Sequence, residues 1–232
     1  ALARNLGSRA FSTGRVTICG FINRHVFSDL TSAFFGNKKA MASSDFEKRL
    51  FTYHPGAQRC ALMFCSFQLK NFIDSLVFGD LLVPKIHHFS SFVMAWLTLH
   101  PGSTHFYVLA SAVTEVPATI SCFLANFDET LGSTVPGLTE SFPKIKLFFN
   151  VATGISFLCF RTLFWSCVFY HYVLDLRRAW NSTKPSCLKW KKTLPLNLFF
   201  SGILFSLQIW MMTDVLERAP AILRTIINNL FS

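Results

Sequence analysis

Long apolar runs separated by short polar segments dominate the pattern of this chain. Most of these runs approach or exceed the ~20 residues that a helix needs to cross a bilayer. Residues that break helices and favour turns, such as Pro84 and Pro185, lie between the runs, and Pro195 lies at the start of the last run. We therefore expect an all-α, multi-pass transmembrane helix bundle with five spans. They cover residues 61–83, 86–99, 104–127, 145–174 and 194–213.

The two ends of the chain differ from this central region. Residues 16–36 contain Arg24, His25 and Asp29, which suit a helix on the membrane surface or, alternatively, a sixth span. The last sixteen residues favour a short interfacial helix. We expect three regions: a basic N-terminal region at 1–59, the transmembrane bundle at 60–216 and an interfacial segment at 217–232.

The first 28 residues have the composition of a mitochondrial transit segment. They contain Arg4, Arg9, Arg15 and Arg24, several serines and threonines, and no acidic residue before Asp29. We expect the mitochondrial inner membrane, with the endoplasmic reticulum membrane as the alternative if this segment is an ordinary basic tail.

Composition agrees with a membrane protein. Apolar residues make up 51% of the chain and charged residues 15%, and 27 of the 232 residues are phenylalanine. The net charge of +10 comes mainly from short segments that flank apolar runs, as topology determinants do, so we expect no nucleic-acid partner. The seven cysteines form no C-x-x-C pair, which argues against both a disulfide framework and a metal site.

One loop carries a strong basic bias. Between residues 177 and 192 there are six basic side chains and no acidic one, so this loop should face the matrix or the cytosol. Such a cluster also suits the head group of an anionic phospholipid such as cardiolipin. The candidate head-group ligands are Arg177, Arg178, Lys189, Lys191 and Lys192.

Ionisable residues inside the apolar runs are costly, so each needs a partner or a function. We predict a structural intramembrane polar cluster and, within it, a buried ion pair between Glu115 and Arg161. Pro117 should kink the helix that carries Glu115. Asp74 lies four residues after Lys70, so these two side chains should pair on one helix face. The predicted cluster consists of Asp74, His87, His88, Glu115 and Arg161.

The paired histidines do not suit a metal ion. Adjacent helical residues point about 100° apart, so His87 and His88 cannot hold one ion from the same face. One of them should face the polar interior near Asp80 or Glu115, and the other the interface. No cofactor is expected besides bound phospholipid.

The runs "FIDSLVFGDLLVPKIHHFSSF", "VLASAVTEVPATISCFLANF" and "NVATGISFLCFRTLFWSCVFYHYVLDL" together resemble the TLC-domain family of membrane proteins. The resemblance depends on the order of Asp74, the paired histidines, Glu115 and Arg161. It implies a TLC-like bundle. The downstream His-Asp set of the ceramide synthases in this family is absent here, which implies the non-catalytic branch.

Two hypotheses follow. The first is a non-catalytic, lipid-binding accessory subunit of a mitochondrial inner-membrane complex, such as a respiratory complex or ATP synthase, with other membrane subunits as partners. The second is a free-standing TLC-type lipid enzyme or lipid sensor, in which the catalytic set would be His87, His88 and Asp74. An enzyme should have a cavity beside the histidines, whereas a packed subunit should not.

Overall fold

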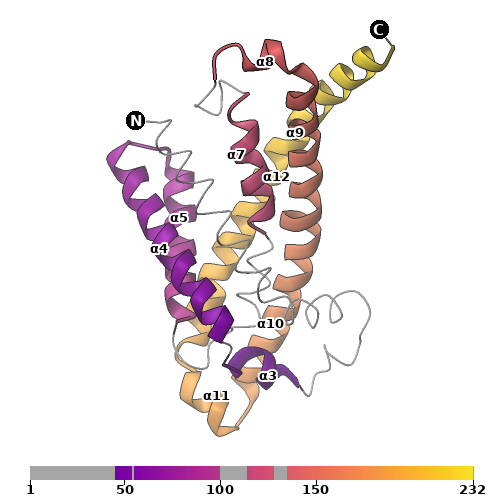
Figure 1. Cartoon of the computed structure of the whole chain (residues 1–232). Helices are drawn as coiled ribbons and strands as arrows, with labels where there is room; N and C mark the ends of the chain where they lie inside the picture. The colour runs from indigo at the N-terminus through magenta and orange to yellow at the C-terminus, as the bar shows by residue number, and fades with distance from the viewer. Residues whose placement is uncertain (1–44, 54, 100–113, 128–134, 232) are drawn as a thin grey trace.

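The computed structural model describes residues 45–53, 55–99, 114–127 and 135–231, and the regular structure of these residues is all helical. This confirms the all-α prediction. The elements are α3 (Phe46–Phe51), α4 (Pro55–Val77), α5 (Leu82–Leu97), α7 (Val116–Leu124), α8 (Leu138–Ser141), α9 (Pro143–Ser156), the π-helix η3 (Phe157–Phe164), α10 (Trp165–Asn181), α11 (Pro185–Trp190) and α12 (Leu194–Phe231) (Figure 1).

The long helices form a bundle around α12. Helices α9, η3 and α10 follow one another without a break and make one continuous rod, and α12 packs against this rod on one side and against α5 on the other. Helix α4 pairs with α5, and α7 packs on α9. Figure 1 shows α3 and α11 at one end of the bundle and α8 at the opposite end.

Two helical stretches in the described part of the chain are long and apolar enough to cross a membrane. They are Pro143–Asn181 and Leu194–Thr213. Only 11% and 22% of their most apolar windows are buried, so a protein core does not account for their apolar character. Helices α4 and α5, which correspond to the first two predicted spans, are not among these stretches. Helix α5 has 16 residues, and residues 16–36 and 100–113 lie outside the described part.

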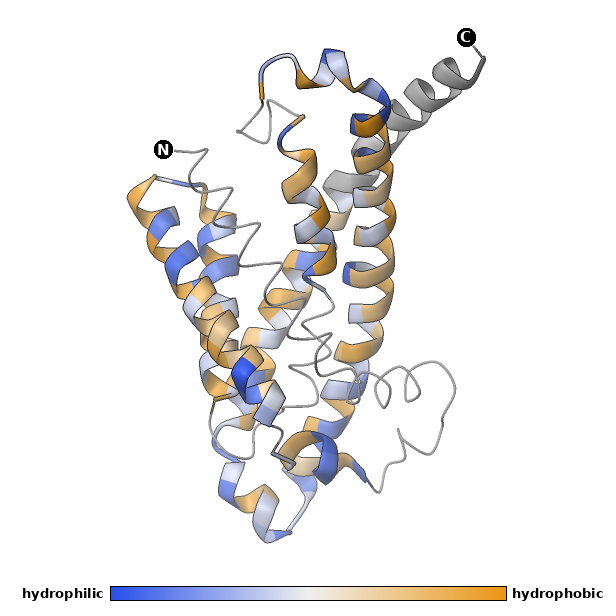
Figure 2. Ribbon diagram, viewed as in Figure 1, coloured by the Kyte–Doolittle hydropathy of each residue, from blue (hydrophilic) through white to orange (hydrophobic). Residues whose placement is uncertain are grey.

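Polar side chains are unusually common in the interior. Gln68, Asn71, Asn197 and Asp175 are among the largest fully buried side chains, while Leu81 is 82% exposed. Figure 2 shows apolar residues on the outer surfaces of the long helices. Polar groups inside and apolar groups outside are the arrangement expected when lipid surrounds the bundle, because apolar surface then gains nothing by being buried in protein.

The turn between the first two predicted spans lies earlier than expected. The sequence places a span at residues 61–83 with Pro84 in the turn, but α4 ends at Val77 and α5 begins at Leu82. Gly79 makes the turn with a φ of 71°, a left-handed conformation that glycine adopts at little cost. Pro84 fits inside the first turn of α5, where no helical hydrogen bond to its nitrogen is required.

Pro117 begins a helix instead of kinking one. Glu115 is the N-cap residue of α7 and Pro117 occupies the second helical position, as the prolines of α9 and α11 occupy their first turns. The predicted kink is therefore wrong for the described residues. Proline is tolerated in the first turn of a helix, because the N–H that it lacks would have no helical hydrogen-bond partner there.

The C-terminal segment is helical, but it is no separate element. Helix α12 runs from Leu194 to Phe231 without interruption, so the interfacial helix predicted at 217–232 is a continuation of the last span. Likewise, the basic loop predicted at 177–192 contains the end of α10 and the short helix α11. The predicted boundary between residues 59 and 60 falls inside α4.

Candidate functional site

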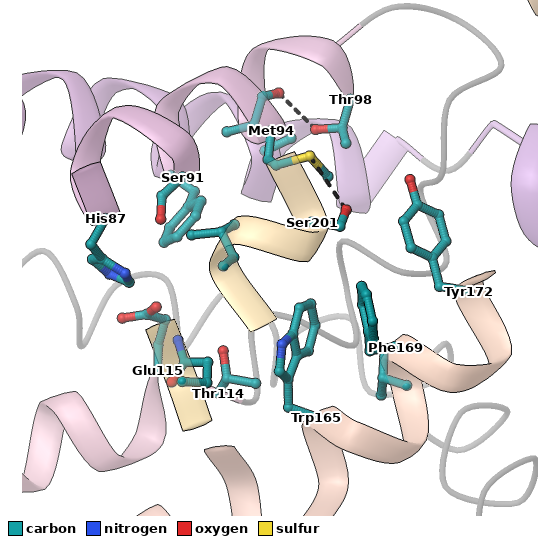
Figure 3. A pocket seen from close by; sticks show the side chains of 16 residues that line it. His87, Ser91, Met94, Thr98, Thr114, Glu115, Trp165, Phe169, Tyr172 and Ser201 are labelled. Atoms are coloured by element: carbon teal, nitrogen blue, oxygen red, sulfur yellow. Dashed lines mark hydrogen bonds between the residues drawn. The ribbon is translucent and has the colours of Figure 1, made fainter. Parts of the chain in front are cut away.

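A cavity of about 80 Å³ lies among α4, α5, α10, α12 and the two residues that precede α7. A water molecule in the liquid occupies roughly 30 Å³, so this space holds a few waters or a small head group. Its walls are mostly apolar, with polar groups at a few points. Among the residues that line it are Phe64, His87, Ser91, Met94, Thr98, Thr114, Glu115, Trp165, Phe169, Tyr172, Ser201 and Gln208 (Figure 3).

His87 and Glu115 meet in this cavity, as the sequence predicts for one of the two histidines. Figure 3 shows the His87 ring and the Glu115 carboxyl group pointing toward one another from α5 and from the start of α7. The Nδ1 atom of His87 is shielded from solvent and has no hydrogen-bond partner among the described residues. Glu115 is 8% exposed. An unsatisfied polar atom in such a site is a candidate for contact with a ligand.

Arg161 lies beside the cavity but does not form the predicted ion pair with Glu115. Within the described part of the chain, its Nε atom donates to the Thr114 carbonyl oxygen at 3.0 Å and its Nη1 atom to Gln208 Oε1 at 3.4 Å. Its guanidinium group also lies 5.0 Å from the centre of the Phe157 ring. Arg161 thus joins η3 to the start of α7 and to α12, and Glu115 stays available to the cavity.

The π-helix η3 contains Arg161 and directly precedes Trp165, so it positions both side chains. A π-helix adds a residue to each turn, is rare and is frequent at functional sites. Trp165 is the first residue of α10 and lines the cavity. Its indole Nε1 atom is shielded from solvent and has no hydrogen-bond partner among the described residues. Sequence reasoning missed Trp165 and Gln208, because both lie in apolar runs without any spacing signal.

The other two members of the predicted cluster lie elsewhere. The Nδ1 atom of His88 is 2.8 Å from Oε1 of the buried Gln68, between α4 and α5. Lys70 Nζ is 2.6 Å from Asp74 Oδ2, which confirms the predicted pair. The five-residue cluster therefore divides into His87, Glu115 and Arg161 at the cavity and two separately bonded residues. No group of three potential metal ligands occurs among the described residues.

The basic end of the bundle contains all the candidate head-group ligands. Arg177, Lys189 and Lys192 are exposed. Lys189 Nζ lies 5.3 Å from the Trp190 ring centre and Lys191 Nζ 5.1 Å from that of Trp180, so two of the lysines rest on tryptophans. Arg178 differs, because its Nη1 atom donates to Asp175 Oδ1 at 2.9 Å.

A buried ion cluster attaches α3 to the same end. Arg49 is 4% exposed and Asp175 is 1% exposed; Nε and Nη2 of Arg49 donate to the two carboxylate oxygens at 2.6 and 2.9 Å. Together with Arg178, Asp175 therefore receives two guanidinium groups. The sequence gives no sign of this contact, since 126 residues separate Arg49 from Asp175.

A second ion pair, at the surface, strengthens this attachment. Glu47 on α3 accepts hydrogen bonds from Lys184 Nζ and from the Ser186 hydroxyl group. These bonds lower the pKa of Glu47, because they favour its charged form. The same contact raises the pKa of Lys184. Helix α3 is thus held by charges to α10 and to the segment around α11.

Comparison with known proteins gives no relative that tests the TLC-domain resemblance. No protein family model, no curated protein and no solved structure matches this chain. The resemblance, and the roles it implies for the paired histidines and Glu115, therefore stay a prediction. What the chain does has to be argued from the cavity and its polar groups.

Proposed function

We propose that this chain is an integral membrane protein with a TLC-like helix bundle, and that it binds a single lipid in the cavity beside His87 and Glu115. The observation that carries the proposal is a cavity with apolar walls in which His87 Nδ1 and Trp165 Nε1 have no described partner. A buried polar atom left without a hydrogen bond costs roughly 1–3 kcal/mol. A ligand that supplies the missing bonds recovers that free energy.

The surroundings of the cavity favour a lipid over a water-soluble metabolite. Two of the helices that line it, α10 and α12, belong to the stretches long enough to cross a membrane. Ligand sites typically combine apolar walls with a few polar groups that fix orientation. Here the polar groups would hold the head group and the apolar walls the first carbons of a chain.

Binding without catalysis is the better-supported form of this proposal. Of the proposed catalytic set, His88 is bonded to Gln68 and Asp74 to Lys70, which leaves His87 as the one member at the cavity. Glu115 faces His87 and can orient its ring, but no second acid-base group of that set is within reach. We therefore propose a lipid sensor or lipid-binding subunit and not an acyltransferase.

The accessory-subunit hypothesis is the second candidate, because part of the polar cluster is satisfied internally. Arg161 bonds to Thr114 and Gln208, and His88 to Gln68, as fold-specifying contacts would. In that role the chain would be a non-catalytic subunit of a mitochondrial inner-membrane complex. The exposed lysines near α11 would bind anionic phospholipid such as cardiolipin, at about 1 kcal/mol for each basic residue at the surface.

One purification tests both candidates. The full chain is isolated from detergent-solubilised membranes, and native mass spectrometry identifies the lipids and proteins that remain bound. Glu115→Gln removes a carboxylate at the cavity, and Asp74→Asn makes the same chemical change at an exposed pair as a matched control. We expect a bound lipid in the wild-type protein and in Asp74→Asn, and at least a fivefold loss in Glu115→Gln, which corresponds to about 1 kcal/mol.

The alternatives give different results. A chain that retains no lipid, or retains it equally in Glu115→Gln, contradicts lipid binding in the cavity. Stable co-purification with respiratory or ATP-synthase subunits supports the accessory role, and a chain that purifies alone contradicts it. Monodisperse elution of each variant on size exclusion shows that the substitution has not unfolded the protein.

A further inference from the structure

The polar end of the cavity contains a donor that needs an acceptor. The indole N–H of Trp165 can only donate, and no described residue accepts from it. The nitrogen-bearing edge of Trp165 faces the side of the cavity where Thr114 and Glu115 lie (Figure 3). A ligand head group must therefore bring an oxygen or another acceptor to Trp165.

Glu115 makes the opposite demand. No described residue donates a hydrogen bond to its side chain, and in its ionised form that side chain can only accept. Arg161 lies close enough for its charge to act on Glu115, but its donors are directed to the Thr114 carbonyl oxygen and to Gln208. Because Glu115 and Arg161 lie together at this end, neither side chain presents an isolated charge to an ionic head group.

These two demands select the chemistry of the head group. Resting on the proposed lipid-binding function, we infer that the cavity binds an uncharged lipid headed by a hydroxyl group, such as a long-chain alcohol. The hydroxyl oxygen accepts a hydrogen bond from Trp165 Nε1, and the hydroxyl group donates a hydrogen bond to Glu115 or His87. One small group thus satisfies both sides of the site, and it fits a cavity of about 80 Å³.

Charged head groups of similar size fit less well. An ammonium group has donors alone, so it leaves the Trp165 N–H unsatisfied. A carboxylate or phosphate has acceptors and a negative charge, which would lie against Glu115. Leaving a buried group unpaired is a strong source of discrimination between ligands of the same shape.

The test uses the full chain in detergent micelles and a hexadecanol probe with a photoreactive diazirine in its chain. Peptides labelled on irradiation are identified by mass spectrometry, and unlabelled hexadecanol, hexadecanoate and hexadecylamine compete. Trp165→Phe removes the donor and keeps an aromatic ring. Trp210→Phe is the matched control, since Trp210 lies on α12, is 55% exposed and does not line the cavity.

We expect labelling of α5 and α10 peptides, competition by hexadecanol at the lowest concentration, and affinity about fivefold weaker in Trp165→Phe but unchanged in Trp210→Phe. Equal or better competition by hexadecanoate or hexadecylamine overturns the hydroxyl inference. So does a Trp165→Phe protein that binds like the wild type. In both cases lipid binding itself stands, whereas failure of all three amphiphiles to reach the cavity peptides contradicts the proposed function as well.

Discussion

Removing the charge of Asp175 should destabilise the protein more than any other single loss of a carboxylate in the described part. Asp175→Asn keeps the size of the side chain but leaves the guanidinium group of Arg49 buried without its counterion. Arg49 is 4% exposed, and both of its hydrogen bonds to Asp175 are 2.9 Å or shorter. Breaking a buried ion pair by removing one partner costs about 3–5 kcal/mol.

The same substitution at an exposed pair provides the comparison. In Asp74→Asn the partner Lys70 is 44% exposed, so water replaces the lost contact and we expect a loss below about 1 kcal/mol. Unfolding of each variant by heat and by denaturant in detergent micelles, followed through the five tryptophans, measures the difference. An Asp175→Asn protein as stable as Asp74→Asn would refute the reasoning.

A double substitution separates the loss of the ion pair from the loss of packing. In Arg49→Met with Asp175→Leu, apolar side chains replace both charges, and replacing a buried ion pair by well-packed apolar residues is often neutral or stabilising. We expect the double variant to be more stable than Asp175→Leu alone. Arg178 is 35% exposed and can turn to water when Asp175 is absent. Equal losses of stability in Asp175→Leu and in the double variant would mean that leaving Arg49 without its counterion does not destabilise the folded protein.

Two further predictions concern the surface attachment of α3 and the turn before α5. Because the pKa of Glu47 is lowered in the folded protein, its contribution to stability is complete above the ordinary carboxyl pKa and is lost as the pH falls through the lowered value. The rates of limited proteolysis of α3 in wild-type protein and in Glu47→Gln should therefore differ at neutral pH and converge in acid. A difference in rate that stays constant with pH would contradict the ion pair with Lys184. Gly79→Ala should cost about 1 kcal/mol because its φ is 71°. By contrast, Gly202→Ala in helix α12, where the added carbon meets nothing within 4 Å beyond the backbone of its own helix, should stabilise by about 0.4–1 kcal/mol; thermal unfolding shows whether the two changes have opposite signs.

Part of the site could be predicted from the sequence because charges in apolar runs are conspicuous. His87, Glu115 and Arg161 attract attention for the cost of burying them, and the structure places all three at or beside the cavity. The direct pairing of Glu115 with Arg161 was wrong, since charge complementarity does not reveal that a backbone carbonyl and Gln208 offer the guanidinium group closer acceptors.

Other features leave no trace in a hydrophobic pattern. Trp165 lies in a run rich in aromatic residues, where the sequence does not distinguish an indole that faces a cavity from aromatic side chains that face outward. The contact between Arg49 and Asp175 joins residues far apart in sequence, and neither belongs to a motif. Proline is tolerated in the first turn of a helix, so Pro84 does not mark the turn that the sequence predicts there, and Pro117 does not mark the predicted kink.

The π-helix at Phe157–Phe164 has a consequence for insertions and deletions in this rod. The 39 residues from Pro143 to Asn181 are continuous, yet the wider turns of η3 shift the angular phase of α10 relative to α9. Deleting one residue within η3 would favour ordinary α-helical winding, in which each residue accounts for about 100°. Such a one-residue change would rotate Trp165 away from Glu115 while leaving both flanking helices intact, so the length of this segment is as much a part of the site as its side chains.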